Sequence, residues 1–131
     1  MNNNRKEKRY RINQLLDNKN RKKYYFDIII NEFPIKARMA DISFAGIGYE
    51  IESQVFTKFD EHEKESIELK IYYPENNINI WAKKIWSIIF EDDGREFLKG
   101  GMMFTSLSSD QRQKLTDLFD SFNRKSSYSE S

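Results

Sequence analysis

Residues 33–49 read FPIKARMADISFAGIGY, and the order of side chains in this stretch indicates a β-strand that ends in a turn. Apolar and polar residues alternate from Ile35 to Met39, as they do in a strand with one buried face. The run ends at Ile42, and a second strand-like run begins at Gly48. The stretch therefore predicts a protein built mainly from β-strands.

Segments of similar composition, rich in β-branched and aromatic residues, recur along most of the chain. They predict six strands, at residues 24–30, 33–42, 48–51, 66–73, 78–90 and 96–104. Turn sequences separate the later strands, namely Pro74-Glu75-Asn76-Asn77 and Asp92-Asp93-Gly94. An Asp-Gly pair suits a hairpin that needs positive φ, so we expect an antiparallel meander over residues 24–107.

The pattern changes to that of a helix near residue 108. Ser108-Ser109-Asp110 can cap a helix, and the apolar residues that follow are spaced to lie on one face, at Leu115, Leu118, Phe119 and Phe122. We expect one amphipathic helix over residues 108–124 that covers an open end or face of the sheet. The serine-rich residues 125–131 are expected to form a disordered tail.

The composition limits the class of protein. The chain has 131 residues, 38% of them hydrophobic, and no cysteine. This suits one domain with a single core and excludes a disulfide framework, a thiolate metal site and a cysteine nucleophile. Because no segment has the apolar run of a signal peptide or a membrane span, we expect a soluble cytoplasmic protein that does not insert into a membrane.

Charge is divided unevenly along the chain. Residues 1–23 hold nine basic and two acidic residues, whereas residues 24–131 hold thirteen basic and nineteen acidic ones. A basic arm on a mildly acidic body can capture a phosphate, a nucleic acid or an acidic surface. The arm is polar, with only Ile12, Leu15 and Leu16 as aliphatic residues after Met1, so we expect a flexible arm with at most a short helical turn; a solvated tail without function is the alternative.

Signatures of enzymes and metal sites are absent from the sequence. His62 is the only histidine, so a catalytic triad or a site with several histidines lacks parts. The carboxylates around it do not have the spacing of an EF-hand. There is no phosphate-binding or dinucleotide loop, and the Gly46-Ile47-Gly48 and Gly100-Gly101 pairs are best explained by close packing or a bulge. We therefore expect that the protein is not an enzyme and that it binds neither a metal nor a cofactor.

Two short motifs stand out. Arg5 and Arg9 form an RxxxR pattern in the basic arm, and Asp41, Ser43 and Gly46 form a DxSxxG pattern at the end of a predicted strand. Each is weak alone, since basic runs are common and the second pattern also fits a serine turn closed by a left-handed glycine. Their order, ahead of a meander and a final helix, is more specific.

With these motifs the chain resembles the PilZ domain family of bacterial receptors for cyclic di-GMP. The resemblance extends from Arg5 to about Phe122 and includes Gly101-Met102-Met103-Phe104, which leads into the last helix. It implies a six-stranded antiparallel β-barrel (a split barrel) with the helix packed beside it, and a ligand held between the arm and the barrel. It also implies that Arg5, Arg9, Asp41, Ser43 and Gly46 bind the ligand. Arg11 offers a further guanidinium, but only Arg5 and Arg9 have the required spacing.

The chemistry of these residues suits cyclic di-GMP, which presents two guanines and two phosphodiesters. An arginine fork donates to guanine O6 and N7 and can also stack on a purine. Asp41 can accept from guanine N1–H and N2–H₂ or orient an arginine, and Ser43 can donate to a phosphate or base. Gly46 would leave room for the base to approach.

These features lead to a hypothesis about function. Residues 1 to about 20 would be mobile without ligand and fold onto the barrel with it, which would create a surface for an unidentified protein partner in motility, adhesion and biofilm formation, or exopolysaccharide control. Exposed aromatic residues could form that partner face, among Tyr72, Tyr73, Trp81 and Trp86; the alternative is that they belong to the core, as aromatic residues at alternate strand positions more often do. The protein would be a monomer or weak dimer that binds no nucleic acid. Two alternatives remain: an interaction domain of the same fold without ligand, and a small-barrel nucleic-acid-binding module.

Overall fold

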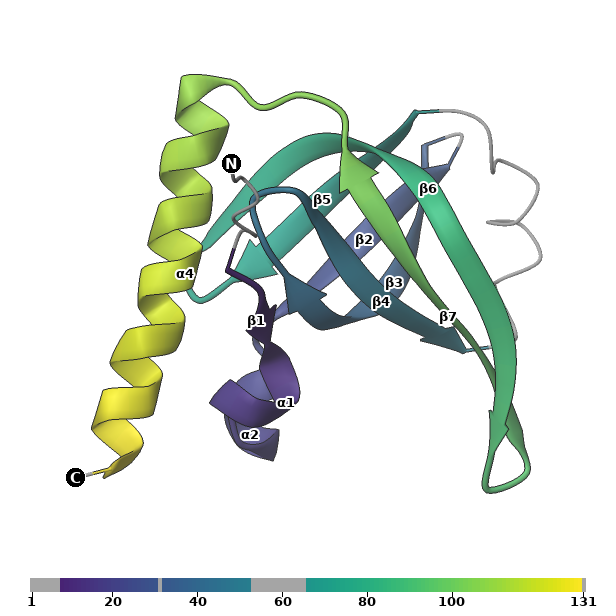
Figure 1. Cartoon of the computed structure of the whole chain (residues 1–131), viewed down its shortest axis with the longest axis horizontal. Coiled ribbons are helices and arrows are strands. Elements are labelled where there is room, and N and C mark those ends of the chain that lie inside the picture. The colour runs from purple at the N-terminus through teal and green to yellow at the C-terminus, as the bar shows by residue number, and fades with distance from the viewer. Residues whose placement is uncertain (1–7, 31, 53–65, 131) are drawn as a thin grey trace, which may run out of the picture.

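The computed structural model describes residues 8–30, 32–52 and 66–130, with side chains described as far as Phe122. Its elements follow the order shown in Figure 1: β1 (Tyr10–Arg11), α1 (Ile12–Leu15), α2 (Asn18–Arg21), β2 (Tyr25–Ile30), β3 (Phe33–Ile42), β4 (Gly46–Glu52), β5 (Ile67–Tyr73), β6 (Asn76–Asp92), β7 (Arg95–Phe104) and α4 (Ser109–Glu130). The arm residue Arg5 and the histidine His62 lie outside the described residues.

The strands form one antiparallel sheet with the order β1-β3-β2-β5-β6-β7-β4. An additional pairing between β3 and β4 closes the six strands β2 to β7 into a barrel, and the short β1 lies beside the end of β3. α4 runs along one side of this barrel (Figure 1). The predicted fold class, a six-stranded antiparallel barrel with a C-terminal helix, is confirmed.

The core follows from strict alternation along the strands. In β2 and β5, every second side chain is buried, and these side chains fill the barrel together with those of β3 and β4. The apolar face of α4 completes the core, since Leu115, Leu118, Phe119 and Phe122 are all buried. None of the helices in the described part of the chain has an apolar stretch long enough to cross a membrane.

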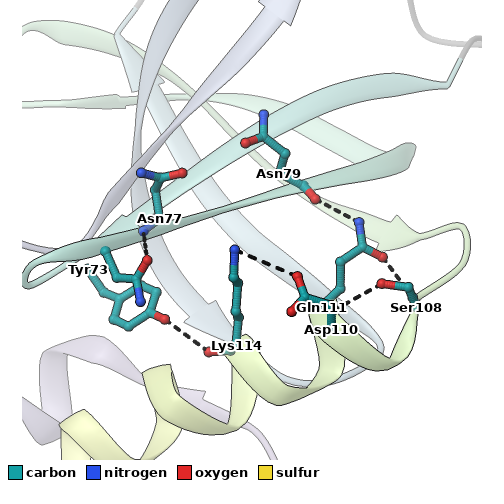
Figure 2. Close-up of polar contacts among 8 residues, drawn as sticks. Tyr73, Asn77, Asn79, Ser108, Asp110, Gln111 and Lys114 are labelled. Carbon is teal, nitrogen blue, oxygen red and sulfur yellow. Dashed lines mark hydrogen bonds and ion pairs between the residues drawn. The ribbon is translucent and has the colours of Figure 1, made fainter.

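The start of α4 is fixed by a capping box (Figure 2). The Ser108 hydroxyl accepts a hydrogen bond from the Gln111 backbone N–H at 3.1 Å, and the Gln111 side chain accepts one from the Ser108 N–H at 2.8 Å. The Gln111 amide also donates to the Asn79 carbonyl of β6 at 2.7 Å. The cap therefore sets both the first turn of α4 and its contact with the barrel.

The predicted strands are present, with boundaries that differ at several ends. β6 is longer than residues 78–90, and β4 begins at Gly46 rather than at residue 48. The β6–β7 turn has positive φ at Asp93 and Gly94, as the Asp-Gly pair predicts. The predicted end of the last helix at residue 124 is too early, because α4 continues to Glu130 through a tail that contains neither glycine nor proline.

The prediction for the arm needs correction from Tyr10 onward. Ile12 is 1% exposed and Leu16 is 5% exposed, so both belong to the core. The ring of Tyr10 stacks on Phe119 of α4, with centroids 4.5 Å apart. Three aliphatic residues are too few for a core of their own, but they suffice to cover an apolar surface that the barrel and α4 already provide. The segment 10–23 is therefore packed against the body rather than forming a separate polar arm.

Candidate ligand-binding site

One row of residues crosses four strands on the outer face of the barrel. Asp41 of β3 lies opposite Gly48 of β4, Gly48 lies opposite Gly101 of β7, and Gly101 lies opposite Trp86 of β6. Residues directly opposite in antiparallel strands have side chains on the same face. The row therefore places a carboxylate at one end and an indole at the other, with two residues that lack side chains between them.

The two glycines are required by close approach rather than by backbone conformation. A Cβ built on Gly48 would lie 2.8 Å from Asp41 Oδ1, and one built on Gly101 would lie 2.6 Å from Trp86 Nε1. Neither glycine has positive φ. The Asp41 carboxylate and the Trp86 indole thus reach inward over a flat floor that any larger residue would block.

Arg9 completes the carboxylate end of the row. Its guanidinium forms an ion pair with Asp41, and the two side chains are 46% and 28% exposed. The short strand β1 holds this arrangement, because its Arg11 lies opposite Asp41 in register. Exposed ion pairs contribute only about 0–1 kcal/mol, so a ligand with its own donors and acceptors can replace this pairing at little cost.

These residues border a hollow of about 390 Å³, which is within the range of small-molecule sites. Arg9 and Asp41 line one side, and Trp86 with Met103 lines the other, over a floor that includes Gly48. Trp86 is 47% exposed. The arrangement suits a planar ring that stacks on an aromatic side chain and has hydrogen-bonding edges, with negative charge nearby for Arg9.

Ser43 has a different role from its motif partners. Its side chain is only 2% exposed, and its hydroxyl accepts a hydrogen bond from the Ala45 N–H at 3.0 Å. The Ser43 N–H also donates to the Gly46 carbonyl at 2.9 Å. Ser43 therefore shapes the turn between β3 and β4, as the serine-turn reading of the sequence states, and it does not border the hollow.

Gly46 is required for contact between strands. A Cβ at this position would lie 2.1 Å from the backbone oxygen of Met102 in β7. The left-handed conformation suggested by the turn reading is wrong, because among the described glycines only Gly94 has positive φ. The absent side chain lets β4 and β7 approach at the border of the hollow.

Comparison with known protein families shows the family to which the chain belongs. The model of the PilZ domain matches residues 3–121 of the chain. The chain belongs to the PilZ domain family. This membership agrees with the prediction that the protein is not an enzyme, and the described part of this PilZ domain contains no group of three or more acidic or histidine residues placed to hold a metal ion.

Solved structures share the fold of this PilZ domain at low sequence identity. The PilZ domain of YcgR from Escherichia coli, with c-di-GMP, is 13% identical with a TM-score of 0.67, and the match covers 94% of each chain. PlzA of Borreliella burgdorferi in complex with c-di-GMP is 10% identical with a TM-score of 0.62, and MrkH, described as a c-di-GMP-dependent transcription regulatory factor, is 19% identical with a TM-score of 0.58. These two matches cover 86% and 88% of this chain but 50% of each of the other chains. No curated protein matches the chain.

The PilZ domain thus brings some of the predicted site residues together. Arg9 and Asp41 are in contact, and Gly46 borders the same hollow, whereas Ser43 lies beneath the turn. Arg5 lies outside the described residues. The sequence analysis missed the residues that form the floor and far wall, which are Gly48, Gly101, Trp86 and Met103. The sequence feature that could have indicated this floor is the two glycine pairs, at residues 46–48 and 100–101, where close packing or a bulge was expected.

The four aromatic residues considered for a partner face differ in exposure. Trp81 is 52% exposed and Trp86 is 47% exposed, whereas Tyr73 is 6% exposed and Tyr72 is intermediate. The two tryptophans are therefore available to a ligand or partner. Tyr73 belongs to the core, where its hydroxyl donates to the Lys114 carbonyl of α4 at 3.3 Å.

Proposed function

We propose that this PilZ domain is a receptor for cyclic di-GMP. The observation that carries the proposal is the Arg9–Asp41 pair, which faces Trp86 across a floor of two glycines at the border of one hollow. Each component matches a feature of the ligand: a guanidinium for guanine O6 and N7 or for phosphate, a carboxylate for the N1–H and N2–H₂ edge, and an indole for the base plane.

In this proposal one guanine lies on the glycine floor against Trp86. Asp41 accepts from its Watson–Crick edge or orients Arg9, and Arg9 donates to the base or to a phosphodiester. Arg5, from the segment that precedes β1, supplies the second guanidinium of the RxxxR motif. Good bidentate base contacts contribute roughly 1–3 kcal/mol each, so this set can reach about 8 kcal/mol, which corresponds to micromolar binding.

The proposed output is a change at the N-terminal segment. Because Ile12 and Leu16 are already buried, any ordering by the ligand concerns the residues that precede Tyr10 rather than the whole segment 1–20. Tyr10 follows Arg9 directly and stacks on Phe119 of α4, so a ligand held by Arg9 lies one residue from the α4 contact. The surface formed there would bind a protein partner in motility, adhesion and biofilm formation, or exopolysaccharide control, in the bacterial cytoplasm.

Calorimetric titration with cyclic di-GMP tests the receptor proposal. The parent is expected to bind at micromolar concentration, and Arg5→Ala, Arg9→Ala and Asp41→Ala are each expected to bind about 10- to 100-fold more weakly, as loss of one bidentate contact requires. Arg38→Ala is the matched control, because Arg38 of β3 forms an exposed ion pair with Glu50 of β4 but does not border the hollow.

The outcomes of this titration are distinct. Absence of binding heat for the parent would refute the receptor function and favour the interaction domain without ligand. Equal weakening by Arg38→Ala and Arg9→Ala would refute the site but not the function. Hydrogen exchange adds a test of the output: ligand is expected to protect amides of residues 5–9, while amides from Ile12 onward are protected in both states.

A nucleic-acid-binding module is the second candidate. Two observations favour it: α2 and the residues that follow it carry Lys19, Arg21, Lys22 and Lys23, and the structural neighbour MrkH is described as a transcription regulatory factor. Against it, residues 24–131 are net acidic, whereas such a groove needs a basic stripe along its strands. We therefore expect no mobility shift of single-stranded or duplex DNA; a shift that cyclic di-GMP does not compete would favour this candidate.

A further inference from the structure

The candidate hollow extends to only one side of its glycine floor. On the outer face of β7, the two residues that flank Gly101 are Lys99 and Met103. Of these two, only Met103 lines the hollow. Met103 lies opposite Gly46 of β4, which is also a lining residue. A ligand that fills the hollow therefore spreads from the floor toward Met103 and away from Lys99.

The residue that stands beyond Met103 in the same row is Lys83 of β6. Lys83 lies opposite Met103 in the antiparallel pairing of β6 with β7, so the two side chains share the outer face. Side chains directly opposite in such a pair have Cβ atoms about 4.5–5.5 Å apart. Because a lysine carries its ammonium group on a flexible four-carbon chain, Lys83 can reach the rim of the hollow.

A bulge in β6 places Lys83 and Trp86 on the same face of the sheet. In a regular strand two residues that are three positions apart point to opposite faces. Here the pairing with β7 shifts between Lys84 and Trp86, and Ile85 falls between the two pairs. Ile85 is 57% exposed and also lines the hollow. The bulge thus presents an ammonium group and an indole to the same ligand site.

The charge of the lining residues does not match a ligand with two phosphodiesters. Among the lining residues that the structure describes, only Arg9 and Asp41 are charged, and they pair with each other. Even with Arg5 included, these residues sum to one positive charge, whereas cyclic di-GMP carries two negative charges. The two phosphodiesters lie on opposite sides of its ring, so cations on two sides of the hollow suit this ligand.

The Lys83 side chain is available to a ligand. It is exposed, and in the described ranges of the chain it has neither an ion pair nor a contact with an aromatic ring. Lys99, one row away on the other side of the floor, differs from it, because its Nζ lies 5.8 Å from the centroid of the Phe90 ring. Lys83 can therefore turn to a ligand without giving up a contact of this kind.

We propose that Lys83 is a ligand-binding residue of this site. Its ammonium group binds the second phosphodiester of cyclic di-GMP, on the side of the hollow formed by Trp86 and Met103, while Arg9 serves the other side. The proposal rests on the receptor function and extends it, because it adds to the site a residue from β6 that belongs to neither sequence motif.

Calorimetric titration with cyclic di-GMP tests the assignment. Lys83→Gln is expected to bind about 5- to 10-fold more weakly than the parent, because it loses one charge-assisted hydrogen bond to phosphate. Lys83→Glu is expected to bind about 30-fold more weakly or worse, because it places a negative charge beside the phosphodiester. Lys83→Arg keeps the charge and is expected to remain within about 3-fold of the parent.

Lys99→Gln is the matched control. Lys99 is an exposed lysine on the same outer face, one row from the floor, but on the side to which the hollow does not extend. We expect its affinity to remain within about 2-fold of the parent. Circular dichroism confirms that all variants are folded.

A spectroscopic measurement tests the contact itself. Reductive methylation with ¹³C-labelled formaldehyde keeps the charge of each lysine and gives it an NMR signal. The Lys83 signal is identified by its loss in Lys83→Arg, and the Lys99 signal by its loss in Lys99→Gln. Cyclic di-GMP is expected to shift the Lys83 signal and to leave that of Lys99 in place.

The outcomes separate this assignment from the receptor function. If Arg9→Ala weakens binding while Lys83→Gln stays within about 2-fold of the parent, the role of Lys83 is overturned and the receptor function stands. Equal weakening by Lys83→Gln and Lys99→Gln, or an unchanged Lys83 signal at saturation, would also overturn it, since either result shows at most a general effect of charge. A parent without binding heat refutes the receptor function, and the role of Lys83 with it.

Discussion

Two neighbouring glycines in the site should respond in opposite ways to the same substitution. In Gly46→Ala the new Cβ would lie 2.1 Å from the Met102 carbonyl oxygen, where ordinary contacts begin at 3.4 Å. Both atoms belong to backbone, so strands β4 and β7 must separate. The hydrogen bond from Phe104 N–H to Ala45 O, 2.9 Å long, joins the two segments beside this point. Its loss, at about 1 kcal/mol, together with the strain of separating the strands, predicts a loss of about 3 kcal/mol in the free energy of unfolding.

In Gly48→Ala the new Cβ would instead meet the Asp41 carboxylate, 2.8 Å away. That group is the end of a partly exposed side chain and can rotate aside, so the expected loss of stability is below about 1 kcal/mol. The rotation separates Asp41 from Arg9, however, so we expect the affinity for cyclic di-GMP to fall by about 10-fold. The two variants therefore distinguish Gly46, which is needed for the packing of two strands, from Gly48, which is needed for the arrangement of the candidate site.

Urea unfolding measures the difference directly. With a slope of about 2 kcal/mol per molar, Gly46→Ala should lower the midpoint by about 1.5 M, whereas Gly48→Ala should lower it by less than about 0.5 M. The expectation from sequence, that Gly46 serves the approach of the ligand, predicts the reverse for Gly46→Ala: unchanged stability and weaker binding. A Gly46→Ala variant within about 0.5 kcal/mol of the parent, or a Gly48→Ala variant as unstable as Gly46→Ala, would refute the argument from close approach.

Three further predictions concern the far wall of the site, the N-terminal segment and alkaline stability. Trp86→Ala should weaken cyclic di-GMP binding by about 10- to 100-fold, because base stacking contributes roughly 1–3 kcal/mol, while the similarly exposed Trp81→Ala should not; equal titration curves for both would exclude Trp86 from the site. Leu16→Ala should lower the free energy of unfolding by about 2 kcal/mol, because the side chain is buried, whereas no change in a urea curve would place residues 12–16 outside the core. Burial, and then the nearby Asp117 carboxylate, raise the pKa of Tyr73 above its ordinary value of 10.0, so the folded state resists ionisation. The parent should therefore keep the stability that the protonated Tyr73 hydroxyl contributes at pH values below 10, and lose it as the pH rises through the raised pKa. Tyr73→Phe should make the fall of the free energy of unfolding with pH less steep, and equal slopes for the two proteins would contradict the assignment.

Much of the fold follows from local sequence. The alternation in β3, the Asp-Gly turn before β7 and the serine cap of α4 each depend on residues close together in the chain, and each was predicted with the correct type of element. The strand ends were less accurate, because a strand continues as long as a neighbour pairs with it. β6 illustrates this, since its last residues are held by β7 beyond the apolar pattern that the sequence displays.

The residues of the candidate ligand-binding site divide in the same way. Arg9 and Asp41 were identified by motif spacing through the family resemblance, and they meet in the structure. Trp86 could not be assigned to the same site from sequence, because its relation to Asp41 passes through three pairings, β3 with β4, β4 with β7 and β6 with β7, and a bulge between Lys84 and Trp86 shifts the register. Nothing in the order of residues states which strands pair or where a bulge falls.

By itself the amino-acid order determined a mainly β domain, its final amphipathic helix, and the charged groups of one side of a candidate site, because periodicity, capping and turn chemistry act over a few residues. Only the tertiary structure decided that Ile12 and Leu16 are buried, that Gly46 allows two strands to approach closely rather than admitting a ligand, and that Trp86 faces Asp41. These facts depend on the register between strands far apart in the chain, which is set by the closure of the barrel and the packing of its core.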